Sequence, residues 1–152
     1  MKPLAMCKLR TAGLASVKSA KFGMVRKNAD GSPRAHQGID LLANKGVAVY
    51  AVGNGTIVGI NMGLDGYGYT ITLKLKDGLF AFYAHLSELL VKVGDKVTEN
   101  QWIGKTGSTG NAKGMETIAR GGHLHFEIRS QQSVGLGLSG RFDPLDYVEL
   151  DA

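Results

Sequence analysis

The pattern of hydrophobic and polar positions predicts short β-strands joined by tight turns from Val47 onward. Residues 47–52 (VAVYAV) form an apolar, β-branched run that leads into Gly53-Asn54-Gly55. Residues 56–60 (TIVGI) form a second run of this kind. Two β-like runs separated by Asn and Gly predict a hairpin that turns at residues 53–55.

A second and stronger hairpin is predicted further along the chain. YTITLKL (69–75) alternates between polar and apolar positions, and LFAFYAH (79–85) follows Asp77-Gly78. Asp-Gly tolerates the positive φ angles of a type I′ turn, which joins antiparallel strands. This hairpin would place His85 near the end of its returning strand.

Shorter elements are predicted towards the C-terminus. Residues 91–110 contain two short strand-like pieces around turns, and residues 110–122, with glycine at both ends, are predicted to form a loop. Asp143-Pro144 is typical of the start of a short helix. Residues 123–129 (HLHFEIR) alternate perfectly, which predicts a strand with two different faces. One face carries His123, His125, Glu127 and Arg129, and the other carries Leu124, Phe126 and Ile128.

Composition agrees with a single, mainly β domain. The chain has 152 residues, of which 43% are hydrophobic, and its 22 glycines against 3 prolines indicate many tight turns. Cys7 is the only cysteine, so no disulfide forms within the chain. No apolar run reaches the roughly 18 residues of a membrane span. Basic residues interrupt every apolar stretch near the N-terminus, so we expect synthesis in the cytoplasm without a classical signal peptide.

Charge is distributed unevenly along the chain. Up to Arg34 there are eight basic residues against Asp30 alone, a net charge of +7, and the remainder carries −2, in line with the total of +5. We therefore predict a basic N-terminal arm over residues 1–21, either solvated or bound to an anionic polymer, before one domain over residues 22–152. The aromatic content of 7% and the lack of basic–aromatic interleaving argue against a nucleic-acid binder, despite the sequence pI of about 9.4.

All four histidines fall in chemically suggestive places. His36 and Asp40 form H-x-x-x-D, His123 and His125 form H-x-H, and His85 ends the predicted hairpin strand. Residues i and i+2 share a face of a strand, and residues i and i+4 share a face of a strand or a helix. Catalytic zinc usually takes three ligands from His, Asp or Glu and leaves one position open for water. The set therefore has the composition of a catalytic metal site with spare histidines for proton transfer.

Four segments together resemble the lysostaphin-type zinc metalloendopeptidases, which cleave cross-links or stem peptides of bacterial peptidoglycan. These segments are RAHQGIDLLANKGVAVYAVGNGTIV, FYAHLS, VKVGDKV with IGKTGSTG, and HLHFEIR, and the similarity covers roughly residues 22–148. The resemblance implies a compact antiparallel β-sheet with few short helices and a metal-containing groove walled by loops. It also implies Zn²⁺ as the cofactor and a peptidoglycan peptide as the substrate.

The resemblance assigns roles position by position. His36, Asp40 and His125 match the zinc ligands, and His85 and His123 match the two catalytic histidines that do not bind the metal. Two features depart from the family pattern. The loop over residues 110–122 is longer than the short link usual in the family, and Asn100 stands where glycine is usual. Asn tolerates left-handed backbone in turns, so we expect the second change to be mild.

The sequence leaves the biological setting open. We expect a monomer that acts at the cell wall or periplasm, as an injected antibacterial toxin with an inhibitory immunity protein or as a phage-type lysin. The alternative function is a non-catalytic wall-binding relative that activates another hydrolase.

Three single residues carry further expectations. Glu127 either orients a metal ligand or pairs with Arg129, and Tyr67 either lines the groove or packs in the sheet. Trp102 is expected in the core.

Overall fold

The computed structural model describes all residues from 1 to 152 and consists of strands with only short 3₁₀ helices between them. No helix is long and apolar enough to cross a membrane. The helices are η1 Val17–Ala20, η2 Gly110–Ala112, η3 Ile118–Arg120 and η4 Pro144–Asp146. The strands are β1 Gly23–Lys27, β2 Pro33–His36, β3 Ile39–Leu42, β4 Ala48–Tyr50, β5 Gly55–Met62, β6 Tyr69–Leu75, β7 Phe80–Leu89, β8 Lys96–Val97, β9 Trp102–Thr106, β10 His123–Arg129 and β11 Arg141–Phe142.

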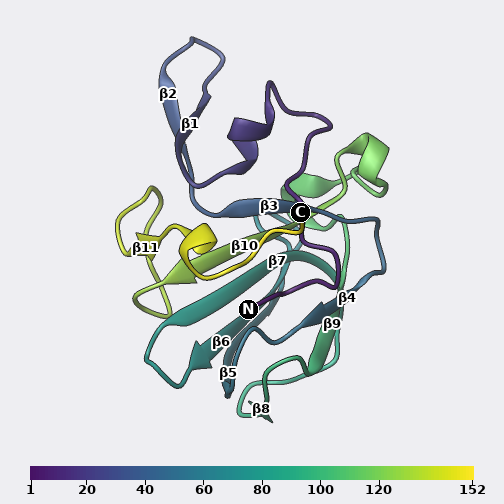
Figure 1. The fold of residues 1–152 in the computed structure, drawn as a ribbon, viewed down its shortest axis with the longest axis vertical. Coiled ribbons are helices and arrows are strands. Elements are labelled where there is room, and N and C mark those ends of the chain that lie inside the picture. The colour runs from purple at the N-terminus through teal and green to yellow at the C-terminus, as the bar shows by residue number, and fades with distance from the viewer.

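Nine strands form one antiparallel sheet around β10 and β7 (Figure 1). Strand β10 pairs with β7 on one side and with β3 and β11 on the other, and β7 continues past β10 to pair with β9. Strands β6, β5 and β8 extend the sheet beyond β7. The predicted mainly β, antiparallel fold with few short helices is confirmed.

The core lies on one face of β10, as the alternation of its sequence predicted. Leu124, Phe126 and Ile128 have no exposed surface, and the ring of Phe126 packs edge-on against Tyr83 of β7 with 5.2 Å between ring centroids. Burial of each of these side chains contributes about 1.5–3 kcal/mol. The histidines of β10 therefore point away from the core, into the site described below.

Strands β6 and β7 form the hairpin predicted over residues 69–85, but with a different turn. Gly78 has a φ of +91°, while Asp77 keeps a negative φ. The amide of Gly78 donates to the carbonyl of Leu75, and the amide of Leu79 donates to the side chain of Asp77. This is a type I turn closed by a left-handed glycine rather than the predicted type I′ turn.

The hairpin predicted at Gly53-Asn54-Gly55 is wrong. Strand β4 pairs with β9, whereas β5 pairs with β6 and β8. None of the three turn residues has a positive φ, so no type I′ turn forms. Gly55 instead allows close approach of strand β6, because a Cβ there would lie 2.1 Å from the carbonyl oxygen of Lys74.

Two further expectations concern the segment around β9. Asn100 has a φ of +69°, which is left-handed backbone. Glycine adopts this conformation readily, so the residue that is usual at this position in the family would fit the same turn. Trp102, expected in the core, is 49% exposed. Its neighbour Ile103 takes the buried position instead, and the indole N–H donates to the carbonyl oxygen of Gly104.

The first ten residues, part of the arm predicted over residues 1–21 as solvated or bound to an anionic polymer, pack against the main fold. Leu4 and Cys7 are buried in the core cluster. The carbonyl oxygens of Pro3 and Lys8 accept hydrogen bonds from the amides of Tyr50 and Leu42. Buried apolar side chains and backbone hydrogen bonds hold this segment against the sheet. The net charge of a segment predicts neither of these interactions. The division of the chain at residue 21 stays a prediction.

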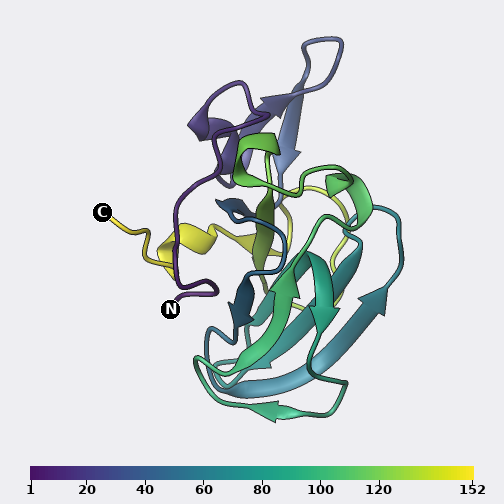
Figure 2. The same ribbon diagram turned by 90° about the vertical axis from the view of Figure 1, so that its right-hand side faces the viewer.

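The chain between these ten residues and β3 forms a separate projection. Strands β1 and β2 make a two-stranded hairpin that extends beyond the main sheet, with η1 beside it (Figure 1). The two chain ends lie on the same side of the molecule (Figure 2), and the side chain of Lys2 reaches that of Asp151 at 2.7 Å. The projection stands over the end of β10 that carries the histidines.

Truncating Leu4 tests whether the N-terminal segment stabilises the domain. Leu4 is 1% exposed, so we expect Leu4→Ala to lower the free energy of unfolding by about 2–5 kcal/mol. Met6→Ala is the matched control, because Met6 is 42% exposed and its loss should cost less than about 0.5 kcal/mol. Urea unfolding followed by circular dichroism measures both values, and equal stabilities for the two variants would contradict the packing of Leu4.

Candidate metal and catalytic site

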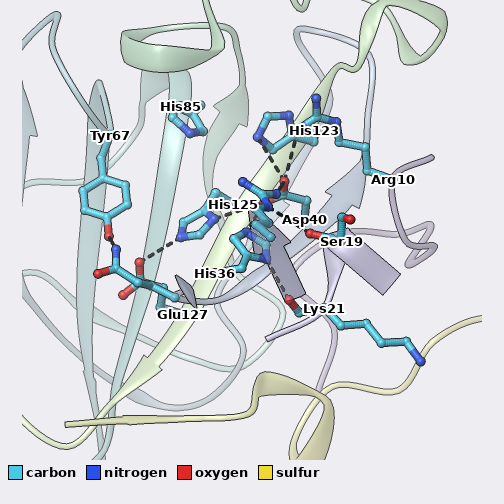
Figure 3. Close-up of polar contacts among 12 residues, drawn as sticks. Arg10, Ser19, Lys21, His36, Asp40, Tyr67, His85, His123, His125 and Glu127 are labelled. Carbon is cyan, nitrogen blue, oxygen red and sulfur yellow. Dashed lines mark hydrogen bonds and ion pairs between the residues drawn. The ribbon is translucent and has the colours of Figure 1, made fainter. Parts of the chain in front are cut away.

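The structure brings together all five residues that the sequence singled out (Figure 3). They come from four strands: His36 from the end of β2, Asp40 from β3, His85 from β7, and His123 and His125 from β10. All five side chains are buried, although polar side chains are seldom buried without a partner or a function. The predicted convergence is therefore present in space.

Strand pairing explains how Asp40 meets the histidines of β10. Asp40 lies directly opposite His125 in the antiparallel pair of β3 and β10. Gly38 permits the turn from β2 into β3 for a steric reason, because a Cβ at Gly38 would lie 2.2 Å from the carbonyl oxygen of Phe126. The chain can thus pass close enough to β10 to place His36 beside Asp40.

His85 reaches the site through an irregularity that the sequence pattern did not predict. Tyr83 faces the core against Phe126, so regular alternation would direct His85 to the core as well. The pairing of β7 with β6 instead shifts register between Tyr83 and Leu86, and His85 has a φ of +58°. A bulge with a left-handed residue re-aims a side chain at a cost in strain. Here it turns the imidazole of His85 towards His123 and His125, whose ring centroids lie 5.2 and 6.1 Å away.

Hydrogen bonds fix which ring nitrogen of His36 and His125 faces Asp40. His36 Nδ1 lies 2.8 Å from the carbonyl oxygen of Lys21, an acceptor only, so this nitrogen carries the proton. His125 Nε2 likewise donates to the carboxylate of Glu127 at 2.8 Å. The opposite nitrogens, His36 Nε2 and His125 Nδ1, lie 3.1 and 3.0 Å from Oδ1 of Asp40.

Three acceptor atoms therefore converge without a donor between them. In neutral imidazoles, His36 Nε2 and His125 Nδ1 present lone pairs, and Asp40 Oδ1 is a carboxylate oxygen. The candidate ligand atoms of these residues lie within 4.8 Å of one another. Such a cluster is repulsive unless a cation or an extra proton occupies its centre. Two imidazoles and one carboxylate suit a zinc ion with an open coordination position, so the residues fit the expected metal.

The second oxygen of Asp40 faces a different set of groups. Oδ2 accepts hydrogen bonds from Arg10 at 3.1 Å and from Arg26 at 2.8 Å. Arg10 is itself buried and also donates to the carbonyl oxygen of Ala12. His123 Nε2 lies 3.8 Å from the same carboxylate oxygen. The two guanidinium groups fix the orientation of the carboxylate and leave Oδ1 directed at the imidazoles.

The protonation of this cluster follows from burial and its charges. Burial alone would raise the pKa of Asp40, but the surrounding imidazoles, His123 foremost, hold it well below the usual range. Burial alone would lower the pKa of His125, but its hydrogen bonds to Asp40 and Glu127 raise it to about 9. In the metal-free protein at neutral pH, the extra proton of His125 therefore takes the central position that a metal ion would fill.

Glu127 is the support of His125. Its Oε2 accepts from His125, and its Oε1 accepts from Nε of both Arg129 and Arg141 at 2.8 and 2.7 Å. Burial would raise the pKa of Glu127, but the bond to His125 and the two arginines keep it far below its usual value. The two roles foreseen for Glu127 thus coexist, because its pairing with Arg129 fixes the oxygen that orients His125. The ring of Tyr67 stacks on that of His125, with centroids 5.5 Å apart.

The rings of His85 and His123 are each oriented by a hydrogen bond to a backbone carbonyl rather than to a carboxylate. Their Nδ1 atoms each lie 2.8 Å from a backbone carbonyl oxygen, of Thr109 and Gly121 respectively. Burial, followed by the neighbouring imidazoles, lowers the pKa of His85 to about 4. Burial also lowers the pKa of His123. Both rings are therefore neutral at pH 7, and each directs an unprotonated Nε2 towards the site.

The five residues lie at the floor of an open cavity of about 990 Å³. The projection formed by η1, β1 and β2 supplies one wall, Gly66 and Tyr67 another, and Asn111 with Met115 of the loop over residues 110–122 a third. This loop contains η2 and η3. A groove walled by loops matches the expectation from the sequence, and it is large enough for a stretch of peptide.

Sequence reasoning missed the two arginines that bind Asp40. Arg10 and Arg26 lie 30 and 14 residues before it, and no spacing rule links them to it. Their place in the basic N-terminal third of the chain is the only signal, and the arm predicted there, solvated or bound to an anionic polymer, ends at residue 21 and so includes Arg10 but not Arg26. The carbonyl groups that orient the histidines carry no sequence signal, because any residue supplies a carbonyl.

Comparison with known proteins assigns the chain to a family. Residues 34–135 match the sequence model of peptidase family M23. The murein hydrolase activator NlpD of Salmonella dublin is 36% identical over 107 residues, or 70% of this chain and 26% of that protein. Glycyl-glycine endopeptidase ALE-1 of Staphylococcus capitis is 40% identical over 93 residues, or 60% of this chain and 24% of that protein. This chain thus spans about a quarter of the length of these relatives.

Solved structures agree with the sequence match. The catalytic domain of the antimicrobial peptidase lysostaphin from Staphylococcus simulans superposes with a TM-score of 0.68 at 34% identity, covering 84% of this chain and 87% of that domain. Both chains are mainly β, and the resemblance stated from the four sequence segments is confirmed. The protein is a member of peptidase family M23, the lysostaphin-type group.

Proposed function

We propose that this protein is a zinc-dependent endopeptidase that hydrolyses peptide bonds in bacterial peptidoglycan. His36 Nε2, Asp40 Oδ1 and His125 Nδ1 would hold the zinc ion, and His85 and His123 would handle protons at the scissile bond. The observation that carries the proposal is the convergence of the three acceptor atoms within 4.8 Å, with the other ring nitrogen of each imidazole already committed.

Bound zinc supplies a Lewis acid that polarises a carbonyl and lowers the pKa of a water molecule towards about 7. The protein's own residues do the rest. His123 and His85 are neutral at pH 7 and present Nε2 as proton acceptors, so one takes the proton of the attacking water. Once protonated, the same nitrogen can return the proton to the departing amine. The backbone carbonyls on Nδ1 hold both rings in this tautomer.

The substrate and the setting follow from the relatives. Their names point to murein and to glycyl-glycine bonds, so the candidates are glycine bridges, D-alanyl cross-links and stem-peptide bonds. Action at the cell wall or periplasm fits the named activators and lipoproteins among the relatives. The delivery route, an injected toxin with an immunity protein or a phage-type lysin, stays a prediction, as does the monomeric state.

A second candidate is a wall-binding activator of another hydrolase. The specific observation in its favour is the 36% identity to the murein hydrolase activator NlpD. The complete set of two imidazoles, one carboxylate and two further neutral imidazoles argues for catalysis, because wall binding alone has no need of buried, mutually oriented histidines. The two candidates differ in whether new peptide ends appear in purified peptidoglycan.

Loss of His123 separates catalysis from metal binding. We expect His123→Ala to lower the rate of peptidoglycan hydrolysis by about 10²–10⁴-fold, because a general base is lost, while zinc remains bound at near one equivalent. The measurement is mass spectrometry of digested peptidoglycan, with and without a chelator, alongside the zinc content of the protein. Intact peptidoglycan after incubation with the zinc-loaded wild-type protein would favour the activator instead.

Loss of the Glu127 carboxylate tests the support of the metal centre. We expect Glu127→Gln to weaken zinc binding by about 10–100-fold, because a neutral amide oxygen accepts from His125 Nε2 without the negative charge that raises the basicity of the ring. Glu88→Gln is the matched control, since Glu88 pairs with the half-exposed Lys105 at the surface. Competition with a chromogenic chelator measures both affinities. An unchanged affinity in Glu127→Gln would show that His125 needs no carboxylate partner.

The pH dependence of zinc binding follows from the pKa of His125. In the metal-free protein this pKa is raised to about 9, so below that pH zinc must displace a proton from Nδ1. We expect the apparent affinity to rise about tenfold per pH unit from about pH 7 to about pH 9 and then to level off. Over the same interval the metal-free fold should lose stability, because a raised pKa stabilises the folded state only while the group is protonated. Affinities that do not change with pH would contradict a protonated His125.

A further inference from the structure

The projection beside the site carries an excess of positive charge, because Asp30, between β1 and β2, is its only acidic residue. Arg10, Arg26, Lys27 and Arg34 line the cavity, and Asp40 is the only carboxylate that does so. Arg10 and Arg26 already share that carboxylate. Lys27 and Arg34 are exposed and form no ion pair or side-chain hydrogen bond in the structure. The wall of the cavity therefore has an excess of cations free to bind an anion.

The arrangement of the hairpin strands adds to this excess. Arg26 lies directly opposite Arg34 in the antiparallel pair of β1 and β2. Like charges in this position destabilise a two-stranded ribbon, whose stability is marginal at best. A bound anion between or beside the two guanidinium groups would remove the repulsion. The hairpin thus has the features of an anion-binding element rather than of a simple structural extension.

The spacing along β2 places this charge close to the reaction. Arg34 and His36 are two residues apart on one strand, so they share a face and their Cα atoms lie roughly 7 Å apart. Arg26, on the neighbouring strand, reaches Asp40 itself. An anionic group held by Arg34 would consequently lie within about one or two residues of a peptide bond placed at the metal site.

We propose that the β1–β2 hairpin selects peptide substrates that carry a free carboxylate near the scissile bond, with Arg34 as the principal contact and Lys27, which lies opposite Pro33 on the adjacent strand, as a further cation of the cavity lining. The proposal rests on the proposed peptidase function and narrows its substrate class. A bridge made of glycine alone has no carboxylate beside its peptide bonds, so it gives these cations nothing to bind. A cross-link between stem peptides offers two sources, a side-chain carboxylate or the carboxylate at the end of a strand.

Three synthetic cross-linked peptides that share one scissile bond test the proposal. One keeps both carboxylates, the second has the side-chain carboxylate as a carboxamide, and the third has the terminal carboxylate as a carboxamide. We expect wild-type protein to cleave one of the amidated peptides about tenfold more slowly in kcat/KM than the parent peptide. The amide that slows cleavage identifies the source. The preference should shrink as salt is added, because Arg34 and Lys27 are exposed.

Variants of the protein assign this preference to the hairpin. Arg34→Gln should reduce the ratio between the parent and the amidated peptide to near one, and Lys27→Gln should reduce it in part. Arg120→Gln is the matched control, because Arg120 is an exposed arginine of the neighbouring loop that does not line the cavity. This control should keep the wild-type ratio.

The outcomes distinguish failure of the carboxylate preference from failure of the proposed peptidase function. Equal cleavage of all three peptides by the wild-type protein would overturn the inference and leave the peptidase function intact. Failure of zinc-loaded protein to cleave these peptides or purified peptidoglycan would overturn the proposed function itself. Loss of binding to an anionic wall polymer in Arg34→Gln, with an unchanged ratio, would assign the hairpin to attachment and contradict its role in selection.

Discussion

The rest of the structure depends on the compensation of one buried carboxylate, that of Asp40. A buried charge is costly unless it is paired and hydrogen-bonded, and Asp40 meets this requirement with each oxygen separately. Oδ1 faces the imidazoles of the candidate metal site, and Oδ2 is held by two guanidinium groups. Because Arg10 and Arg26 come from different parts of the N-terminal third, this single side chain ties the first residues, the β1–β2 hairpin and the main sheet into one unit. The same contacts restrict rotation of the carboxylate, so the protein's own side chains organise the candidate metal site.

The histidines follow a common rule that makes the site specific. In each ring one nitrogen is committed to a fixed acceptor, a backbone carbonyl or Glu127, and the other is left for chemistry. The acceptors and the surroundings of the rings differ in their effect on the pKa. The carboxylates beside His125 raise its pKa to about 9, whereas burial lowers the pKa of His85 and His123, whose acceptors are backbone carbonyls. His36, a candidate metal ligand, also donates to a backbone carbonyl, so the acceptor alone does not separate the candidate ligands from the other two rings.

The sequence predicted the parts of the fold that depend on local pattern. The alternation over residues 123–129 located β10 and its two faces, and Asp77-Gly78 located the turn between β6 and β7. The H-x-x-x-D and H-x-H spacings also predicted that His36 and Asp40, and His123 and His125, share a face, whereas His85 joined the set through the family resemblance. What the sequence could not predict depends on contacts between distant segments. The bulge at His85 and the pairing of β4 with β9 follow from strand packing, and the contacts of Arg10 and Arg26 join positions without a fixed spacing.

The boundary of the family match coincides with a physical division in the site. The match begins at residue 34, so it contains all five clustered residues, whereas Arg10, Arg26 and Lys27 precede it. The floor of the cavity therefore belongs to the region that matches the family model, and most of its charged wall is built by chain outside that region. Selectivity requires a difference in binding between competing substrates, and a wall can supply it without displacing the groups that act on the peptide bond. Arg10 and Arg26 connect the two parts, because the same residues that stand in the wall also fix the orientation of Asp40. A change in the wall at these two positions would consequently alter the candidate metal site, whereas a change at Lys27 or Arg34 would leave its contacts in place.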